Sequence, residues 1–501
     1  MSYPFWDQPI GYGVLMAMIA VFHVFISHFA IGGGLYLVVT ERAARRAGDA
    51  DQLAFLEKLS KFFALTTLVT GALTGVGIWF IIGLLAPTAT EALIHNYVWG
   101  WATEWTFFVV EIAAAMFYFY GWKRMTARAH EVIGWIYFVA AWLSLVIING
   151  ILTFMLTPGR WLENGDFWTG FFNPTYWPSL VVRTGICVML AGLYALLTAS
   201  RLEAGDFKAR MVRHSALWAL AGLAVTALTQ VWYWKAIPAG LIAKAAQAMP
   251  TPMKAMGISL WLAAALAAIA IVLVLAAPKR LGMPVAVGIM VLGLGWFGAF
   301  EWTRESLRKP YVVTGYIYGN GQEVALSETY RRDGLLAHIP YRTGDDAADL
   351  FRHACRSCHT LDGYKALKPA FAGADKAFIT AIVQGAQHLK GNMPPFLGTP
   401  AEAELIAGWL HQRTDHRTLA EIHPGADLGR KAYDLRCGKC HVVGTASDKS
   451  KSLAGQSAED LNGLLDMASS LGEGMPAYTG DAAERKALVA YLQTLGQGGK
   501  P

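Results

Sequence analysis

Two copies of a five-residue motif of cysteine and histidine carry the clearest chemistry in this sequence. The copies are Cys355-Arg-Ser-Cys358-His359 and Cys437-Gly-Lys-Cys440-His441. In such a C-x-x-C-H motif, two thiols bond the porphyrin of a c-type haem and the histidine binds its iron. A thioredoxin-like C-x-x-C pair and a zinc site are the alternatives, but neither requires histidine directly after the second cysteine. The motifs therefore predict two covalent c-type haems.

The two motifs belong to a tandem repeat in which equivalent residues are 82 positions apart. This offset relates Cys437 to Cys355 and Met475 to Met393, and each of these methionines precedes a proline. An amphipathic helical pattern closes each unit. The repeat resembles two tandem class I cytochrome c domains. The resemblance implies Met393 and Met475 as the sixth ligands of the two haem irons, and a thioether ligand raises the reduction potential.

Two carboxylates lie inside a long apolar stretch, Gly100–Met125, that could span a bilayer. Glu104 and Glu111 are seven residues apart, so they share one face of the predicted helix. A carboxylate in hydrocarbon is costly unless it is paired, protonated or bound, and it is therefore a functional candidate by default. The alternative is two buried acids satisfied by neighbouring helices. We expect Glu104 and Glu111 to deliver protons, because reduction of an acceptor in a dry site requires them.

The elements that position these residues follow from the distribution of apolar residues. Hydrophobic residues make up 54% of the 501 residues and charged residues only 16%, which is typical of an integral membrane protein with a polar appendage. The sequence predicts an all-α fold, with a polytopic membrane bundle of about eight spans followed by two small all-α cytochrome c domains. The expected spans are 10–40, 62–86, 97–122, 131–156, 178–199, 213–236, 253–277 and 282–303. The expected domains are the membrane domain 1–311, a linker 312–344, and cytochrome c domains at 345–418 and 419–501.

Basic residues predict the orientation of the bundle. One set of loops carries 14 lysines and arginines, whereas the opposite loops hold only Arg160, Lys235 and Lys244, with Lys254 just inside the seventh span. The positive-inside rule then places both chain ends and the c domains in the periplasm, with the bundle in a bacterial inner (cytoplasmic) membrane. Attachment of c-type haem also takes place outside the cytoplasm, so the two arguments agree. The modest net charge of +6 indicates no nucleic-acid partner.

The membrane part resembles subunit I of the cytochrome bd quinol oxidases over roughly residues 10–311. The similar segments are FHVFISHFAIGGGLYL, the paired acids with FYFYGWKRM after them, ARAHEVIGW, LVIING, the segment Lys254-Ala-Met256, and ESLRKPY from Glu305 onward. The resemblance implies His23, Met256 and Glu305 as iron ligands of non-covalent haems. We expect two or three such haems, of b type or d type.

Two departures from that family concern its quinol-oxidising end. Arg183 in LVVRTG stands where the family has a histidine ligand of a low-spin b haem. Arginine does not bind iron but can pair with a haem propionate, and we expect this of Arg183 and Arg308. The long loop that carries the family's quinol site is reduced here to KAIPAGLIAKAAQAMPTP. His28, on the same predicted helix as His23, could hold a relocated b haem.

These features predict a membrane-bound respiratory haem protein, and we favour an oxidoreductase. It would transfer electrons between two periplasmic c haems and buried b- or d-type haems. The favoured interpretation is a bd-like oxygen reductase fed by cytochrome c. The alternative is an electron-transfer subunit that exchanges electrons between quinone or quinol and a periplasmic partner without oxygen chemistry. The sequence leaves open the terminal acceptor, the haem type and the direction of electron flow.

Several partners follow from this interpretation. The lipid bilayer surrounds the bundle, and we expect a second bd-like or other membrane subunit beside it. A periplasmic electron-transfer protein would exchange electrons with the c domains. The sequence leaves open whether quinone is a further partner.

Overall fold

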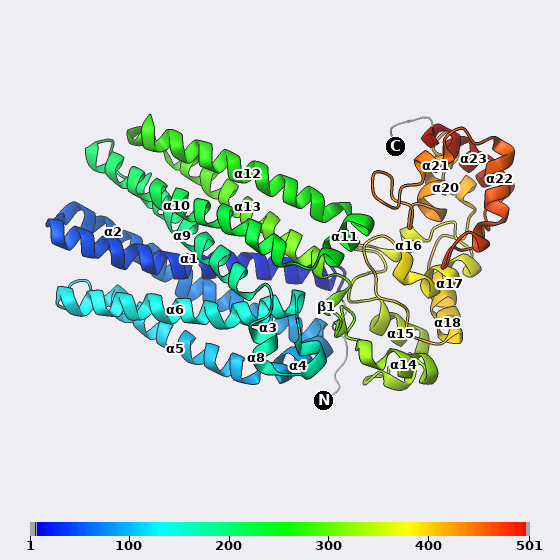
Figure 1. Ribbon diagram of the computed structural model, residues 1–501, viewed down its shortest axis with the longest axis horizontal. Helices are drawn as coiled ribbons and strands as arrows, with labels where there is room; N and C mark the ends of the chain where they lie inside the picture. Colours follow the sequence, from blue (N-terminus) through cyan, green and yellow to red (C-terminus); the bar gives the residue numbers. More distant parts are fainter. Residues whose placement is uncertain (1–5, 7, 497–501) are drawn as a thin grey trace.

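The computed structural model describes residues 6 and 8–496. Figure 1 shows a bundle of long helices and, at one end of it, a cluster of short helices. Eight helices of the bundle are long and apolar enough to cross a membrane, by length and composition. This arrangement confirms the predicted fold class. The two extreme ends of the chain, which we expect in the periplasm, lie outside the described residues.

The bundle is built from eight helical spans, one of which contains a π-helical segment. The spans are α1 (Tyr12–Ala47), the run of α2 (Ala50–Ala64), η1 (Leu65–Gly71) and α3 (Ala72–Leu85), α5 (Val98–Gly121), α6 (Ala127–Leu156), α9 (Tyr176–Ala199), α10 (Asp206–Ala236), α12 (Pro250–Leu275) and α13 (Met283–Arg308). Short helices connect them, namely α4 (Pro87–Asn96), α7 (Trp161–Asn164), α8 (Phe167–Phe171), α11 (Ala239–Ala248) and η2 (Pro278–Arg280). The π-helical segment is η1. Such segments are rare and frequently occur at functional sites.

Helix α9 lies at the centre of the bundle, where glycines bring backbones together. It is the most buried of the eight spans and packs against α1 and α10. A Cβ atom added at Gly32 of α1 would lie only 1.8 Å from the carbonyl oxygen of Cys187 on α9. On the other side, a Cβ atom at Gly222 of α10 would lie 2.2 Å from the amide nitrogen of Met189. Small residues at these crossings allow the close approach that packing between membrane helices requires.

The basic loops gather at the end of the bundle opposite the c domains, which we call the basic end (Figure 1). Ion pairs join these loops to one another. Arg210 contacts Asp49 at 2.6 Å, and Lys279 contacts Asp206 at 2.6 Å. The alternation of charge along the sequence therefore corresponds to two chemically different ends of one bundle.

The expected linker 312–344 is folded and contributes to two cores. It contains β1 (Tyr311–Val313), β2 (Ile317–Tyr318), η3 (Val324–Leu326), α14 (Ser327–Asp333) and η4 (Leu335–His338). The two strands form an antiparallel hairpin. Ile317 packs in the core of the bundle, whereas Tyr330 and Leu335 pack in the core of the c domains. This segment therefore fixes the two parts of the molecule to one another.

The two c domains share one helical plan. The first contains α15 (Asp346–Ala354), α16 (Leu367–Ala370), α17 (Lys376–Gln384), η5 (Ala386–His388) and α18 (Pro400–His411), and α19 (Leu419–Ile422), which follows it, packs against the second domain. The second contains α20 (Leu428–Arg436), α21 (Ser450–Leu453), α22 (Ala458–Asp466), η6 (Ala468–Ser470) and α23 (Ala482–Gly496). In each domain the helix before the cysteine motif crosses the closing helix through one aromatic pair. Phe351 lies 5.1 Å from Trp409, and Tyr433 lies 5.6 Å from Tyr491, measured between ring centroids.

Candidate functional site

The two motif histidines are oriented in the same way. The Nδ1 atom of His359 lies 3.0 Å from the carbonyl oxygen of Lys365, and that of His441 lies 3.4 Å from the carbonyl oxygen of Ser447. Each acceptor follows its histidine by six residues, so the repeat extends to this bond. A hydrogen bond from Nδ1–H to a carbonyl fixes the tautomer and leaves Nε2 available to a metal.

The chemistry of these donors fits haem. Burial lowers the pKa of His359 and of His441, which favours the neutral imidazole that binds iron. Burial also raises the pKa of the Cys355 and Cys437 thiols to about 12. Over residues 6 and 8–496, no group of three or more His, Cys, Asp and Glu side chains could hold a metal ion. A haem iron needs only two protein ligands, because the porphyrin supplies the others.

A cluster of charged side chains lies in the bundle near the c domains. We call it the arginine cluster, and it consists of His28, Arg183, Glu301, Arg304, Glu305 and Arg308. Arg183 forms an ion pair with Glu301 at 2.9 Å, and Arg304 contacts the same carboxylate at 2.9 Å. Arg308 pairs with Glu305. Neither Glu301 nor Arg304 was predicted as a site residue from the sequence.

The arginine cluster holds more buried donors than acceptors. Arg183 Nε, Arg304 Nη1 and Arg308 Nε are buried and have no hydrogen-bond acceptor among the described residues. Three arginines face two glutamates, so the cluster carries an excess of positive charge. An anionic group would satisfy these donors, since arginine binds carboxylates in charge-assisted hydrogen bonds. The cluster therefore fits the propionates of a haem.

The expected iron ligands of the bundle come from three helices, with His23 and His28 on α1, Met256 on α12 and Glu305 on α13. His23 faces α3, and its Nδ1 atom lies 3.0 Å from Thr74 Oγ1, just beyond the π-helical segment. His28 is buried, with Nδ1 2.9 Å from the carbonyl oxygen of Val24 and Nε2 3.3 Å from Arg183 Nη1. Both nitrogens of His28 are therefore engaged by the protein, whereas His23 keeps Nε2 available.

Met256 and Glu305, the other expected ligands of the bundle, lie on different helices. Met256 is half-buried in the second turn of α12. Glu305 lies near the end of α13, with 46% of its side chain exposed. Their roles as haem ligands stay predictions.

The two carboxylates of α5 each contact a hydroxyl group of α6. Glu104 accepts a hydrogen bond of 3.0 Å from Ser144, and Glu111 accepts one of 3.2 Å from Tyr137. Both glutamates are half-buried. Their place in a long apolar stretch predicted that they lie within a membrane span, but it did not predict how much of each side chain is covered. Ser144 and Tyr137 were missed by the sequence analysis. Their seven-residue spacing on one face of the predicted fourth span is the signal that could have identified them.

The cysteine motif of the first c domain lies against the start of the chain and the bundle. Arg356 donates a hydrogen bond to the carbonyl of Gln8, and the amide of Tyr364 lies 3.4 Å from the carbonyl oxygen of Pro9. These partners immediately precede α1, the helix that carries His23. The motif is therefore placed next to the end of the bundle.

The segment before Met393 also contacts the bundle. The amide of Gly391 donates to the carbonyl oxygen of Ala248, the last residue of α11, at 3.0 Å. The Asn392 side chain lies 3.5 Å from the carbonyl oxygen of Lys309, next to the end of α13. Both segments expected to hold the first c haem thus face the bundle.

The second c domain contacts the first through its own cysteine motif. The carbonyl oxygen of Lys439 accepts a hydrogen bond of 2.6 Å from the amide of Lys390. Arg436, which is 4% exposed, forms an ion pair of 2.8 Å with Glu484 and lies 3.7 Å from Asp375 of the first domain. The contacts therefore run from the second domain to the first domain and on to the bundle.

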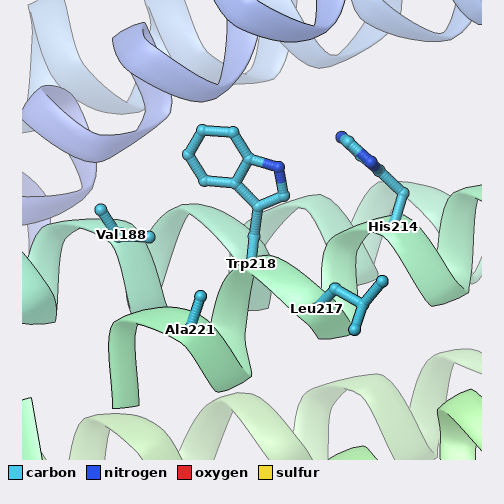
Figure 2. A pocket seen from close by; sticks show the side chains of 5 residues that line it. All are labelled: Val188, His214, Leu217, Trp218 and Ala221. Atoms are coloured by element: carbon cyan, nitrogen blue, oxygen red, sulfur yellow. The ribbon is translucent and has the colours of Figure 1, made fainter. Parts of the chain in front are cut away.

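A surface hollow of about 390 Å³ lies on α9 and α10, away from these contacts. Figure 2 shows the Trp218 and His214 side chains projecting from α10 to the same side. The hollow is lined by Val188, His214, Leu217, Trp218 and Ala221. None of the residues expected at a haem site lines it.

Comparisons with known proteins agree with this division of the chain. Residues 14–245 match the family model of cytochrome bd terminal oxidase subunit I. Residues 342–410 and 424–492 each match the family model of the cbb3-type cytochrome c oxidase subunit III. The matched part of the bundle ends before α12 and α13, so Met256 and Glu305 lie outside it.

A solved structure shows a similar fold. It is described as the bd oxidase from Geobacillus thermodenitrificans, and it is 15% identical with a TM-score of 0.51. The similarity covers 60% of this chain and 87% of that chain. No curated protein sequence matches significantly. This chain is a respiratory haem electron-transfer protein of the membrane, in which a region like cytochrome bd oxidase subunit I is joined to two cytochrome c domains.

Proposed function

We propose that this protein is a bd-like oxygen reductase that receives its electrons from cytochrome c-type donors rather than from quinol. The observation that carries this proposal is the position of the first c domain. Its two haem-binding segments contact the bundle at Pro9, Ala248 and Lys309, beside the arginine cluster. Electron transfer weakens steeply with distance, so a donor domain should lie against the acceptor region.

The short helix α11 supports the choice of donor. It occupies the place where bd oxidases of the quinol type have a long loop, and its last residue, Ala248, binds the backbone of Gly391. Lys244 of the same helix lies 5.8 Å from the ring of Tyr311. Helix α11 thus contacts both the first c domain and the connecting hairpin.

Haem, when bound, supplies one-electron chemistry and, at an iron with an open position, a binding site for a small acceptor. We infer that the six motif residues and the two methionines hold two c haems. For the two or three b- or d-type haems of the bundle, His23, Met256 and Glu305 are the candidate ligands, with His28 as a further candidate if Arg183 moves. Arg183 and Arg308 would bind propionates. The c domains would lie in the periplasm of a bacterial inner membrane.

The protein's own part in the chemistry is to move protons and to exclude water. Glu104 and Glu111 each share a hydrogen bond with a hydroxyl group, so each can accept a proton and pass it on. Both also lie on a helix whose other face is apolar and exposed, with Trp105 63% and Phe117 57% exposed. Because a half-buried carboxylate at membrane depth needs cover, we expect a second membrane subunit beside α5.

Two donors distinguish the proposal from its alternative. Purified protein is mixed with either a reduced c-type cytochrome or a short-chain quinol, and oxygen consumption and haem reduction are followed. We expect rapid oxygen consumption with the cytochrome and slow reduction by quinol. A Cys437→Ala variant should lose most of this activity, whereas Cys187→Ala, a buried cysteine outside the motifs, should keep it.

Haem spectra provide an independent test of the same proposal. A pyridine haemochrome spectrum and a spectrum of the reduced protein with carbon monoxide identify the haem types. A high-spin b haem or a d haem is the expected result. If only low-spin haem is present and quinol reduces it faster than cytochrome does, the protein is an electron-transfer subunit and the proposal is wrong.

A further inference from the structure

The two c domains are equivalent helix by helix under the offset of 82 residues. Adding 82 to the bounds of α15, α17 and η5 gives the bounds of α20, α22 and η6 without a residue of difference. Each surface of one domain therefore has an identifiable counterpart on the other. What covers a surface of the first domain can be compared with what covers its counterpart on the second.

One face of the first c domain is covered by the second domain. We call it the receiving face, and it consists of Ala370, Asp375, Phe378, Gly385, His388 and Lys390. Lys439, inside the second cysteine motif, donates a hydrogen bond of 2.9 Å from Nζ to the carbonyl oxygen of Ala370. The carbonyl oxygen of Lys439 accepts a hydrogen bond from the amide of Lys390. The cysteine motif of the second domain therefore lies on the receiving face.

Two further contacts place the surroundings of that motif and of Met475 on the same face. Arg436, directly before the motif, has its guanidinium carbon 4.7 Å from the ring centroid of Phe378. A Cβ atom added at Gly474, directly before Met475, would lie 2.3 Å from the His388 ring. The receiving face thus contacts both segments that we propose hold the second c haem.

The counterpart of the receiving face on the second domain is uncovered. Adding 82 gives the terminal face, whose residues are all exposed, namely Ser452, Ser457, Asp460, Met467, Ser470 and Gly472. The equivalent leucines Leu389 and Leu471, beside the two faces, are 8% and 49% exposed. Met467, at the position of Gly385, is 53% exposed. Helix α22 lies on the side of the c domains away from the bundle, so a separate protein can reach it (Figure 1).

The terminal face has the composition of a protein interface. Met467 and Leu471 provide an apolar centre, and methionine is enriched in such centres. The stretch 457–473, which contains five of the six residues of the terminal face, carries four acidic residues and no basic one. Two of them, Glu459 and Glu473, are exposed and form no ion pair in the described part of the chain. An apolar centre with an acidic margin fits a partner that carries basic side chains.

We propose that the terminal face is the docking site of a separate c-type cytochrome whose cysteine motif is flanked by basic residues. The receiving face binds such a surface already, since Arg436 and Lys439 flank the second motif and Arg436 lies 3.7 Å from Asp375. On the terminal face, Glu459 and Glu473 offer carboxylates to the corresponding cations. A second copy of this chain cannot present this surface, because its motifs are engaged by the bundle and by its own first domain.

The direction of electron transfer rests on the proposed function, in which a c-type donor supplies the electrons, whereas the docking itself does not. One electron leaves the docked cytochrome and reduces the second domain, and no bond forms or breaks. Gly472 lies three residues before Met475 on the terminal face. Lys390 lies three residues before Met393 on the receiving face. Each face therefore adjoins a segment that we propose binds haem.

The first test measures docking apart from oxygen consumption. The full-length protein is held in lipid nanodiscs without oxygen, and the probe is mitochondrial cytochrome c, a basic c-type cytochrome. Surface plasmon resonance with the oxidised probe gives the dissociation constant. Stopped-flow absorbance with the reduced probe gives the second-order rate constant of c-haem reduction. Leu471→Glu should weaken binding and slow this reduction about tenfold, as expected for a central contact of an interface.

Charge reversal tests the acidic margin of the terminal face. Glu459→Lys combined with Glu473→Lys should slow association with the probe about tenfold at low ionic strength. The difference from wild type should shrink at high ionic strength, because charges at the margin of an interface act mainly on the association rate and are screened by salt. Haem staining checks that each variant carries both c haems.

Helix α18 of the first domain provides matched controls. Leu405 is 42% exposed, and its neighbour Glu404 is also exposed. Leu405→Glu and Glu404→Lys should bind the probe and accept electrons from it as the wild type does. Equal losses in the control and test variants, or no binding of the probe by the wild type, would overturn the proposal. If the wild type binds the probe and is reduced by it but consumes no oxygen, the proposed function fails and the docking site stands.

Discussion

Single hydrogen bonds orient the residues that are expected to bind iron. His359 and His441 are each held through Nδ1 by a backbone carbonyl six residues later, and His23 is held through Nδ1 by Thr74. In all three cases Nε2 is the nitrogen left for a metal. His28 differs, because Val24 and Arg183 engage both of its nitrogens. At this scale the structure favours His23 over His28 as an iron ligand.

The cysteine motifs give the most direct prediction at the residue scale. Cys355→Ala and Cys437→Ala should each remove one of two thioether-attached haems, so haem-stained denaturing gels should lose about half of their intensity. Met393→Ala should leave the first haem attached and lower its reduction potential, because the thioether ligand is lost. Potentiometric titration measures that change. Full staining of a variant with both cysteine substitutions would contradict the assignment.

Arg183 gives a second prediction at this scale. Its replacement by alanine leaves the carboxylate of Glu301 buried beside a single arginine, Arg304, and the loss of one partner of a buried ion pair typically costs about 3–5 kcal/mol. The thermal unfolding midpoint of Arg183→Ala should therefore fall, together with its content of non-covalent haem. Arg280→Ala, an exposed arginine at the basic end, should leave both nearly unchanged. Normal haem content in Arg183→Ala would argue against a propionate at this arginine.

At the scale of elements, helix contacts in the bundle depend on glycines, which let two helix backbones approach closely. The glycines of α1 and α10 bring these helices against α9, and α9 in turn places Arg183 opposite Glu301. The glycines of α1 and α10 thus determine the position of the arginine cluster, although they do not belong to it. The π-helical segment η1 similarly sets the rotation of α3, which carries the Thr74 partner of His23.

The crossing of α1 and α9 can be tested with one methyl group. In Gly32→Ala the new Cβ atom would overlap the Cys187 carbonyl, so α1 and α9 must separate, at a cost of roughly 1–3 kcal/mol. We expect a lower unfolding midpoint and weaker retention of the bundle haems. Gly288→Ala in α13, where a Cβ atom meets nothing within 4 Å, is the matched control. Equal stability of the two variants would show that this crossing is looser than described.

At the scale of the whole molecule, the c domains are stacked on one end of the bundle and the basic loops lie at the other (Figure 1). The segment 312–344 joins the two parts by packing into both cores. Since the cysteine motif and the Met393 segment of the first domain both face the bundle, the c domains form an ordered series rather than two independent carriers.

The orientation of this series in the membrane is a prediction of its own. The basic loops should face the cytoplasm and the c domains the periplasm, because positive charge is retained inside. A reporter that is active only in the cytoplasm should therefore be silent when it is fused after Pro501. The same reporter inserted in the loop between α9 and α10, at Glu203, should be active. The reverse pattern would contradict the topology and the maturation of the c haems.

The sequence by itself determined the properties that depend on residues close together in the chain. Eight apolar runs, two C-x-x-C-H motifs, the 82-residue repeat and the alternation of basic loops are all local, and the membrane fold with two cytochrome c domains follows from them. The expectation of c-type haem followed in the same way, since a histidine directly after the second cysteine of a C-x-x-C pair is the attachment motif of that haem.

Only the tertiary structure decided which of these residues meet. Arg183 faces Glu301 across 118 positions of the chain, and Glu41 faces His130 across 89. The contact of Gly391 with Ala248 is of the same kind. Such pairs depend on how each helix is rotated about its axis and on how closely glycines let neighbouring helices approach. A hydrophobic period shows that a helix has a buried face, but side-chain packing between helices selects the partner that this face meets.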